Sequence, residues 1–175
     1  MRQIALIGMT GSGKSTVADL LSSSLNIPVI STGDLARQMA KEDEGTSMAL
    51  NNGMMAPESA MRKLVESAVS QALSKHGGYI IEGFPRTTAQ VIALLGWCDK
   101  PPEFYVLDTD PIECVKRLLA RGRPDDTPDS IAKKIEFYET VTSQAIKLLG
   151  PKAVTVKLTV NQDPVTTILE REYDE

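Results

Sequence analysis

A glycine-rich segment near the amino terminus, Gly-Met-Thr-Gly-Ser-Gly-Lys-Ser-Thr at positions 8–16, has the composition and spacing of a phosphate-binding loop. It fits Gly-x-x-x-x-Gly-Lys-Ser/Thr and follows an apolar run at residues 4–7. Glycines there permit backbone conformations in which successive N–H groups converge on phosphate at the start of a helix. The alternative is a flexible Gly/Ser turn between strand and helix. The residues predicted to hold a triphosphate are Gly11, Ser12, Gly13, Lys14, Ser15 and Thr16.

Within this loop, the side chains predict distinct contacts. Lys14 would reach the β and γ phosphates of the nucleotide. The hydroxyl group of Ser15 or Thr16 would be available as a ligand of Mg²⁺.

Two predicted strands are each followed closely by an arginine, Arg37 after residues 29–31 and Arg86 after residues 79–82. The carboxyl ends of parallel strands meet at one edge of a sheet, so both side chains would lie near the glycine-rich loop. Two guanidinium groups placed there could hold a second phosphate group.

A third basic segment, residues 117–126, carries Arg117, Arg121 and Arg123, and Lys134 lies on the helix predicted after it. Taken alone, each arginine would more often be a solvated surface charge. Several arginines at the mouth of one cleft favour an anion-binding site, because their positive potentials add.

The elements that must position these residues alternate along the chain. Apolar, β-rich runs predict strands at residues 3–8, 29–31, 79–82, 104–108 and 154–158. Helical patterns fall at residues 14–25, 33–40, 58–75, 87–97, 111–121, 130–149 and 164–172. This alternation predicts a three-layer α/β fold, a five-stranded parallel sheet flanked by helices, with the nucleotide at the carboxyl ends of the strands.

Composition narrows the function classes. A chain of 175 residues, 42% hydrophobic and 24% charged, is ordinary for one globular domain spanning residues 1–175. A net charge of −4 argues against a nucleic-acid-binding surface, and no apolar run approaches the ~20 residues of a membrane span. Cys98 and Cys114 lack the spacing of metal ligands. We therefore expect reduced thiols in a cytoplasmic protein without nucleic-acid or membrane partners.

Five segments, in this order, resemble the nucleoside monophosphate kinases of the P-loop class, and among them most closely the adenylate kinases. The segments are GMTGSGKST, STGDLAR, EGFPRTTAQ, RLLARGRPDD and VNQDPV. The resemblance covers nearly the whole chain. It implies a P-loop nucleoside triphosphate hydrolase-like core, with a small acceptor-binding insert at residues 32–57 and a very short lid at residues 121–128.

The same resemblance implies roles for individual side chains. Lys14 would act on the ATP phosphates, Arg37 and Arg86 on the acceptor phosphate, and Arg121 and Arg123 on the transferring phosphoryl group. Arginine and lysine, together with Mg²⁺, would neutralise the charge that spreads during phosphoryl transfer.

Two further roles follow from the resemblance. Arg117 resembles the residue that stacks on the donor adenine. Asp125 and Asp126 resemble an acidic pair in the lid, and the alternative for them is a solvated turn before Pro128.

The chain departs from the family pattern at several positions. One glycine separates Arg121 from Arg123, so the lid is short and cannot bind zinc. Lys134 stands where the family usually has an arginine, which gives a point charge instead of a planar fork. Glu82 replaces an aspartate beside the waters of Mg²⁺, and Ser15 replaces a glycine, which restores a hydroxyl ligand.

The resemblance implies transfer of the γ-phosphoryl group of Mg-ATP to AMP, giving two ADP. Thr32 and Gln90 match adenylate kinase positions, and an amide offers both the donor and the acceptor that adenine requires. Met54 and Met55 could pack on the base, and Gly83 lies beside the acceptor arginine. The partners expected are ATP, AMP and ADP, bound by a monomer. The alternatives are a kinase for UMP, CMP or several nucleotides, and a nucleotide-binding regulator of low activity.

Overall fold

The computed structural model describes residues 1–97, 100–157 and 163–171, and its centre is a parallel sheet. The strands are β1 (Gln3–Gly8), β2 (Val29–Ser31), β3 (Tyr79–Glu82), β4 (Glu103–Asp108) and β5 (Ala153–Lys157). They lie in the order β2-β3-β1-β4-β5, and every pair is parallel. The predicted five-stranded parallel sheet is thus confirmed. Leu158, predicted at the end of the last strand, lies outside the described residues.

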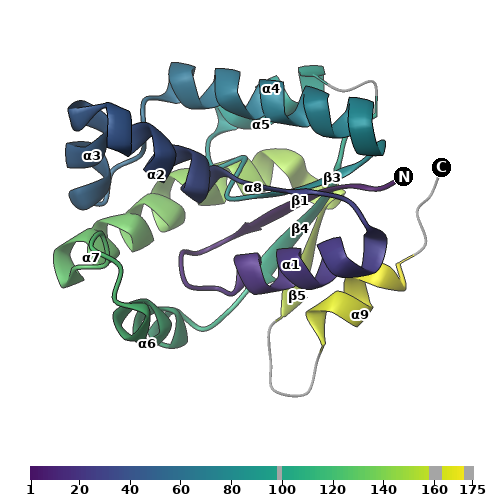
Figure 1. The fold of residues 1–175 in the computed structure, drawn as a ribbon. Helices are drawn as coiled ribbons and strands as arrows, with labels where there is room; N and C mark the ends of the chain where they lie inside the picture. Colours follow the sequence, from purple (N-terminus) through teal and green to yellow (C-terminus); the bar gives the residue numbers. More distant parts are fainter. Residues whose placement is uncertain (98–99, 158–162, 172–175) are drawn as a thin grey trace.

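Helices cover both faces of the sheet (Figure 1). They are α1 (Lys14–Leu25), α2 (Thr32–Glu42), α3 (Glu44–Asn51), α4 (Glu58–His76), α5 (Thr88–Trp97), α6 (Pro111–Arg121), α7 (Pro128–Phe137), α8 (Ser143–Leu149) and α9 (Pro164–Leu169). Helices α4, α5 and α8 lie on one face, and α1 and α9 lie on the other. The three-layer α/β fold is the predicted one.

Each strand supplies both halves of the core, because successive side chains of a strand point to opposite faces. In β1, Ala5 and Ile7 pack with α4, α5 and α8, whereas Ile4 and Leu6 pack with α1 and α9. All four side chains are buried. Burial on both faces explains why the strands read as continuous apolar runs in the sequence.

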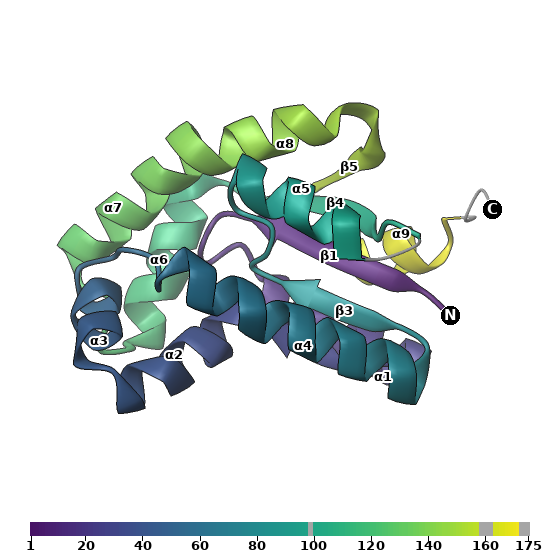
Figure 2. The same ribbon diagram turned by 90° about the horizontal axis from the view of Figure 1, so that it is seen from above.

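The remaining helices gather beyond the carboxyl ends of the strands. Figures 1 and 2 show α2, α3, α6 and α7 together at that end of the sheet, with the amino terminus at the other. After β1 the chain forms β2 and β3 on one side of this strand. It then crosses to the other side, where it forms β4 and β5. The strand order therefore reverses at β1, which opens a crevice at the end of this strand.

Helix boundaries follow the expected signals. The side chain of Asp110 accepts hydrogen bonds from the first turn of α6, whose first residue is Pro111, and Thr127 does the same for α7. Gly77 and Gly122 end α4 and α6 in the left-handed conformation. None of the helices in the described ranges is long and apolar enough to cross a membrane.

Three helix predictions need correction. The single helix predicted at residues 130–149 is instead α7 and α8, separated by a π-helical segment, Tyr138–Thr142. A π-helix has i→i+5 backbone hydrogen bonds, and helix propensities do not distinguish these from the bonds of an α-helix. The helix α3 was not predicted, because its sequence includes glycine, serine and threonine; Asp43 stabilises it by capping the Thr46 N–H at 2.6 Å. The last helix ends at Leu169, before the predicted residue 172.

Candidate active site

A cavity of about 380 Å³ occupies the crevice at the carboxyl end of β1. Its walls come from the β1–α1 loop, α2, the segment after α3, the β3–α5 loop, α6 and α7. The sequence-predicted site residues all line it except Ser12, which is fully buried beneath the loop. The structure therefore brings together side chains that are more than 100 positions apart in the chain.

The glycine-rich loop forms the floor of the cavity and runs directly into α1. Gly11 and Gly13 have φ angles of 81° and 91°, which only glycine adopts without strain. A Cβ atom at Gly11 would lie 2.6 Å from the carbonyl oxygen of Cys114, so α6 packs against the loop backbone. Cys114 is buried and free, whereas Cys98 lies outside the described residues.

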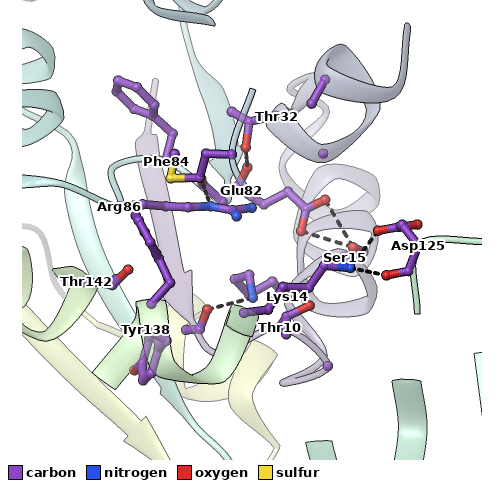
Figure 3. Close-up of a pocket in the computed structure, with 18 of the residues that line it drawn as sticks. Thr10, Lys14, Ser15, Thr32, Glu82, Phe84, Arg86, Asp125, Tyr138 and Thr142 are labelled. Atoms are coloured by element: carbon purple, nitrogen blue, oxygen red, sulfur yellow. Dashed lines mark hydrogen bonds and ion pairs between the residues drawn. The ribbon is translucent and has the colours of Figure 1, made fainter. Parts of the chain in front are cut away.

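Lys14 lies at the centre of this floor (Figure 3). Its ammonium group donates to the carbonyl oxygens of Gly8 at 2.8 Å and Met9 at 2.7 Å, and to the hydroxyl of Ser12 at 3.3 Å. Burial, together with the nearby positive charge of Arg86, lowers the pKa of Lys14 to about 8. An anion in the cavity would therefore stabilise a charge that the protein itself stabilises poorly.

A hydroxyl and carboxylate cluster lies beside Lys14. The hydroxyl of Ser15 donates to both carboxylate oxygens of Glu82 at 3.0 Å, and Ser31 donates to one of them at 2.7 Å. Oxygen atoms of this kind are the ligands that Mg²⁺ prefers, so Ser15 and Glu82 fit the predicted metal site. Within the described part of the chain, no group of three or more His, Cys, Asp or Glu residues could hold a metal ion. Any Mg²⁺ would then depend mainly on phosphate oxygens and water.

Two positive charges on the acceptor side of the cavity, Arg86 and Arg123, form no ion pair with a carboxylate of the described residues. Arg86 donates from Nε to the carbonyl oxygen of Gly83 at 2.6 Å, and burial lowers its pKa, with Arg37 adding to the shift. The pKa of Arg123 is also lowered by burial, and then by the charges of Arg37 and Arg121. Arg37 forms an ion pair with Asp34 at the exposed edge of the cavity. Mutual repulsion of these groups favours a bound anion.

The two residues predicted to select the base are both buried at the cavity wall. The hydroxyl of Thr32 donates to the carbonyl oxygen of Glu82 at 3.0 Å. The side-chain oxygen of Gln90 accepts the backbone N–H of Arg86 at 2.7 Å. The amide nitrogen of Gln90 makes no hydrogen bond to any described residue. Both side chains thus fix the loop that carries Arg86, and Gln90 keeps its donor group for another partner.

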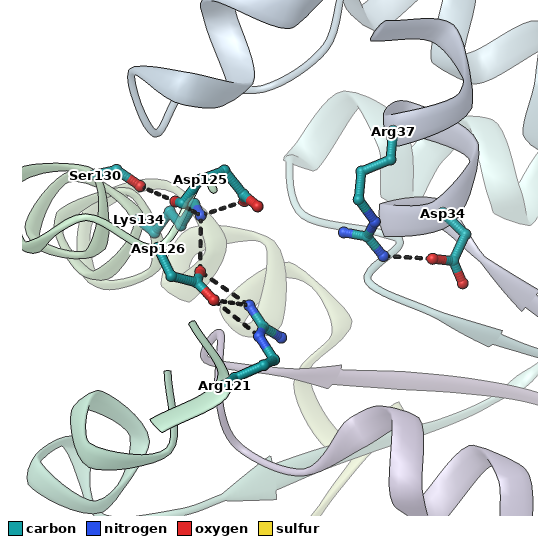
Figure 4. Close-up of polar contacts among 7 residues, drawn as sticks. All are labelled: Asp34, Arg37, Arg121, Asp125, Asp126, Ser130 and Lys134. Atoms are coloured by element: carbon teal, nitrogen blue, oxygen red, sulfur yellow. Dashed lines mark hydrogen bonds and ion pairs between the residues drawn. The ribbon is translucent and has the colours of Figure 1, made fainter. Parts of the chain in front are cut away.

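On the other side of the cavity, the segment at residues 121–128 is held by ion pairs (Figure 4). Arg121 donates from Nε and Nη2 to the two carboxylate oxygens of Asp126, both at 2.9 Å. Lys134 donates to the carbonyl oxygen and a carboxylate oxygen of Asp125, both at 2.6 Å. The solvated-turn alternative is therefore wrong for Asp126, whose side chain has no exposed surface. Arg117 pairs with Glu113 at 2.9 Å on the exposed face of α6.

The acceptor insert touches the helix after the predicted lid. Gly53, in the segment after α3, has a φ angle of 74° and is buried. A Cβ atom here would lie 2.6 Å from the carbonyl oxygen and 2.9 Å from the Cα of Ser130 in α7. Only glycine permits this approach of two backbones, which meet at the mouth of the cavity.

Among the lining residues that the sequence prediction missed are Phe84, Tyr138 and Thr142. Phe84 is buried and stacks on Trp97 with ring centroids 5.7 Å apart, so it supports the loop that carries Arg86. Tyr138 and Thr142 approach the cavity from the π-helical segment (Figure 3). No local motif marks them; their spacing of four residues on one helix is the only signal that the sequence contains.

Comparisons with known proteins agree with this geometry. Residues 7–132 match a family model described as an AAA domain, a class of P-loop domain. "Adenylate kinase 1" of Nostoc sp. is 34% identical over 95% of both chains. The chain belongs to the adenylate kinase family. "Adenylate kinase" of Bifidobacterium longum is 33% identical over 88% of this chain and 89% of the relative. That of Mycobacteroides abscessus is 36% identical over 83% and 84%.

Membership of the adenylate kinase family confirms the predicted class of protein. The chain is an adenylate kinase-like nucleoside monophosphate kinase with a P-loop α/β fold. The matched regions cover 83–95% of this chain and 84–95% of these three relatives.

Proposed function

We propose that this kinase transfers the γ-phosphoryl group of ATP to AMP, giving two molecules of ADP. The observation that carries the proposal is the meeting, in one cavity, of the glycine-rich loop with three cations, Lys14, Arg86 and Arg123, that form no ion pair with the described residues. Lys14 and Arg86 are the two nearest the floor, and both have lowered pKa values. Two nucleotides with their phosphates facing each other would supply the missing negative charge.

On the donor side, ATP would lie along the glycine-rich loop with its phosphates at the start of α1. The backbone of residues 11–16 would hold the β and γ phosphates, and Lys14 would exchange its carbonyl partners for phosphate oxygens. Arg117, exposed at the cavity edge, would stack on the adenine ring. Bound with ATP, Mg²⁺ would neutralise phosphate charge, and Ser15 and Glu82 would hold it through its waters.

On the acceptor side, the insert at residues 32–57 would form the wall of the AMP site. Arg37 and Arg86 would hold the acceptor phosphate in line with the γ-phosphoryl group. Gly83 would let the backbone approach this phosphate, since a side chain there would meet the Arg86 guanidinium at 2.8 Å.

The adenine of AMP would be recognised by one hydrogen-bonding side chain and an apolar surface. The free amide donor of Gln90 would bind an acceptor atom of the ring, and Thr32 would fix the wall beside it. Met55, part-buried in the cavity, would pack on the face of the base.

During transfer, Arg121 and Arg123 would stabilise the charge that develops on the moving phosphoryl group. The lid segment at residues 121–128 holds Arg121 rigidly through Asp126, so this charge is in place before reaction. Contact of the insert with α7 would exclude water and so limit transfer to water. All these groups come from one chain, which supports a monomeric enzyme of nucleotide biosynthesis in the cytoplasm.

The test is a coupled assay of ADP formation with Mg-ATP and each of AMP, CMP, UMP, GMP and dAMP. We expect AMP to exceed CMP and UMP in kcat/KM by about tenfold or more, the value of one or two hydrogen bonds. Equal turnover of CMP or UMP would contradict the choice of AMP and would indicate a kinase of broader range. No turnover with any of the five would indicate a nucleotide-binding regulator.

A further inference from the structure

The environment of Lys134 differs from that expected of a phosphate ligand. An ammonium group has three N–H donors. The amine of Lys134 has three contacts within the described residues: the carbonyl oxygen of Asp125 at 2.6 Å, a carboxylate oxygen of Asp125 at 2.6 Å, and a carboxylate oxygen of Asp126 at 3.4 Å. All three contacts lead into the lid segment, and the side chain is only 17% exposed. No donor remains for a phosphate group unless one of these contacts breaks.

Asp126 connects Lys134 to Arg121. Its carboxylate has no exposed surface and receives Arg121 through two hydrogen bonds and Lys134 through one. One oxygen, Oδ1, accepts from both cations. Lys134 therefore fixes the orientation of the Asp126 carboxylate, and this carboxylate in turn fixes the orientation of the Arg121 guanidinium.

Arg121 has the free donors that Lys134 lacks. A guanidinium group has five N–H donors in one plane, and Asp126 uses two of them, on Nε and Nη2. The remaining donors lie on a side chain that lines the cavity. Arg121 and Lys134 balance the carboxylates of Asp125 and Asp126, so the cluster presents to the cavity a fixed guanidinium group with unused N–H donors.

We propose that Lys134 is a positioning residue, which orients Arg121 through Asp126 and does not bind the transferring phosphoryl group. The proposal rests on the phosphotransferase function given above. It gives a physical reason for lysine at this position: a compact ammonium group fits between a carbonyl oxygen and two carboxylates, which a planar guanidinium fork matches less well.

The experiment is a double-mutant cycle on the full chain, with kcat measured for Lys134→Met, Asp126→Asn and the double variant. If Lys134 acts through Asp126, Lys134→Met should lower kcat about tenfold alone and less than about twofold in the Asp126→Asn background. KM for AMP should stay within about twofold throughout, because the acceptor site is untouched. Equal tenfold losses in both backgrounds would show a direct contact with the phosphoryl group and overturn the proposal.

Variants that break the buried Asp126 cluster can unfold the protein. A second double-mutant cycle therefore tests the same proposal with a less disruptive change. Arg121→Lys replaces Asp126→Asn in this cycle and keeps a cation beside the carboxylate. Lys134→Met should again cost less than about twofold in that background, and an unchanged tenfold loss would overturn the proposal. The matched control is Lys133→Met, on the exposed face of α7, which should leave kcat unchanged.

Lys134→Arg supplies an independent readout. An arginine at a phosphate-binding position should support turnover at least as high as the wild type. A positioning role predicts lower turnover, because the larger planar group displaces Asp126, together with faster amide hydrogen exchange in residues 121–128. Wild-type turnover is measured first: its absence with every nucleotide would contradict the proposed function, whereas an additive cycle with normal turnover would contradict only the role of Lys134.

Discussion

A part-buried arginine lies at each end of the sheet, and the two differ in their hydrogen-bond and ion-pair partners. At the amino end, Arg2 donates to Glu103 at 2.8 Å, to the hydroxyl of Tyr105 at 3.0 Å and to the carbonyl oxygen of Ile168 at 2.9 Å. At the carboxyl end, the side chain of Arg86 makes a single hydrogen bond to the described residues, to the carbonyl oxygen of Gly83. Neither guanidinium is fully exposed, yet within the described part of the chain only Arg2 forms an ion pair with a carboxylate.

The pKa values express this difference. Hydrogen bonding to Glu103 raises the pKa of Arg2, whereas burial lowers the pKa of Arg86. Partners in place offset the cost of burying a charge, whereas a buried charge without them lowers stability until a ligand binds. The amino end of the sheet is therefore built for stability, and the carboxyl end keeps unsatisfied positive charge for anionic substrates.

The largest effect should come from Lys14→Met at the carboxyl end. Loss of the ammonium group removes charge from the phosphates in the transition state, so turnover should fall by orders of magnitude. The melting temperature should stay nearly unchanged, because the lost charge was poorly stabilised by the fold. Activity in the coupled assay and a thermal melt measure the two quantities. Near-normal turnover of the variant would contradict the P-loop mechanism.

The converse is expected of Arg2→Met at the amino end. Glu103, whose side chain is 10% exposed, would be left without its cation, at a cost of about 2 to 3 kcal/mol in the free energy of unfolding. Urea denaturation should show this loss, and kcat should not change. The double variant Arg2→Met/Glu103→Gln is the control and should recover part of the stability. Unchanged stability of the single variant would show that the cluster is not stabilising.

A smaller effect is expected from Gln90→Ala. The preference for AMP over CMP should fall several-fold, mainly through a higher KM for AMP, because the free amide donor of Gln90 is lost. Since the same side chain holds the backbone N–H of Arg86, kcat should also fall slightly. Gln71→Ala, an exposed glutamine on α4, is the matched control. An unaltered preference in Gln90→Ala would exclude this residue from base recognition.

The smallest predicted effect is the uptake of a proton by Lys14 when ATP binds. The pKa of Lys14 is about 8 in the folded protein and 10.5 in an unfolded chain, so the unfolded chain binds more protons between these values. Stability without ligand should therefore rise with pH across that window, and Lys14 should add no pH dependence below it. Bound phosphate favours the ammonium form, so ATP affinity should fall as pH rises above 8.

Calorimetry measures this linkage directly. Titrations with ATP at pH 8, in buffers of different ionisation enthalpy, should show an uptake of up to about half a proton per ATP. Lys14→Arg should abolish the uptake, because a guanidinium stays charged. Equal heats for the wild type in all buffers would mean that Lys14 is already fully charged in the free enzyme.

Local patterns were sufficient to predict the sheet and the glycine-rich loop. Each strand is a continuous apolar run, and the loop is a contiguous motif whose geometry glycine dictates. The convergence of Arg37 and Arg86 on one cavity also follows from a single rule, that parallel strands end at one edge of the sheet.

What the sequence could not predict depends on tertiary contacts. The partners of Lys134 are chosen by the fold of the segment at residues 121–128, and nothing in that segment's composition distinguishes a buried Asp126 from a solvated one. The close approach of Gly53 to Ser130 joins residues from different elements, and it becomes visible only when both backbones are placed.

The π-helical segment at Tyr138–Thr142 has a consequence for how this enzyme tolerates insertions and deletions. It joins α7, which carries Lys134, to α8, which is anchored in the core by Ala145 and Leu149. Because the wider π turn takes up one extra residue, deleting one residue from it would give an ordinary α-helix with α7 and α8 in nearly the same relative orientation. Deleting a residue between Lys134 and this segment would instead rotate Lys134 by about 100° relative to α8 and carry it away from the acidic pair. The π-helical segment is therefore where this long helix can lose a residue while Lys134 keeps its place.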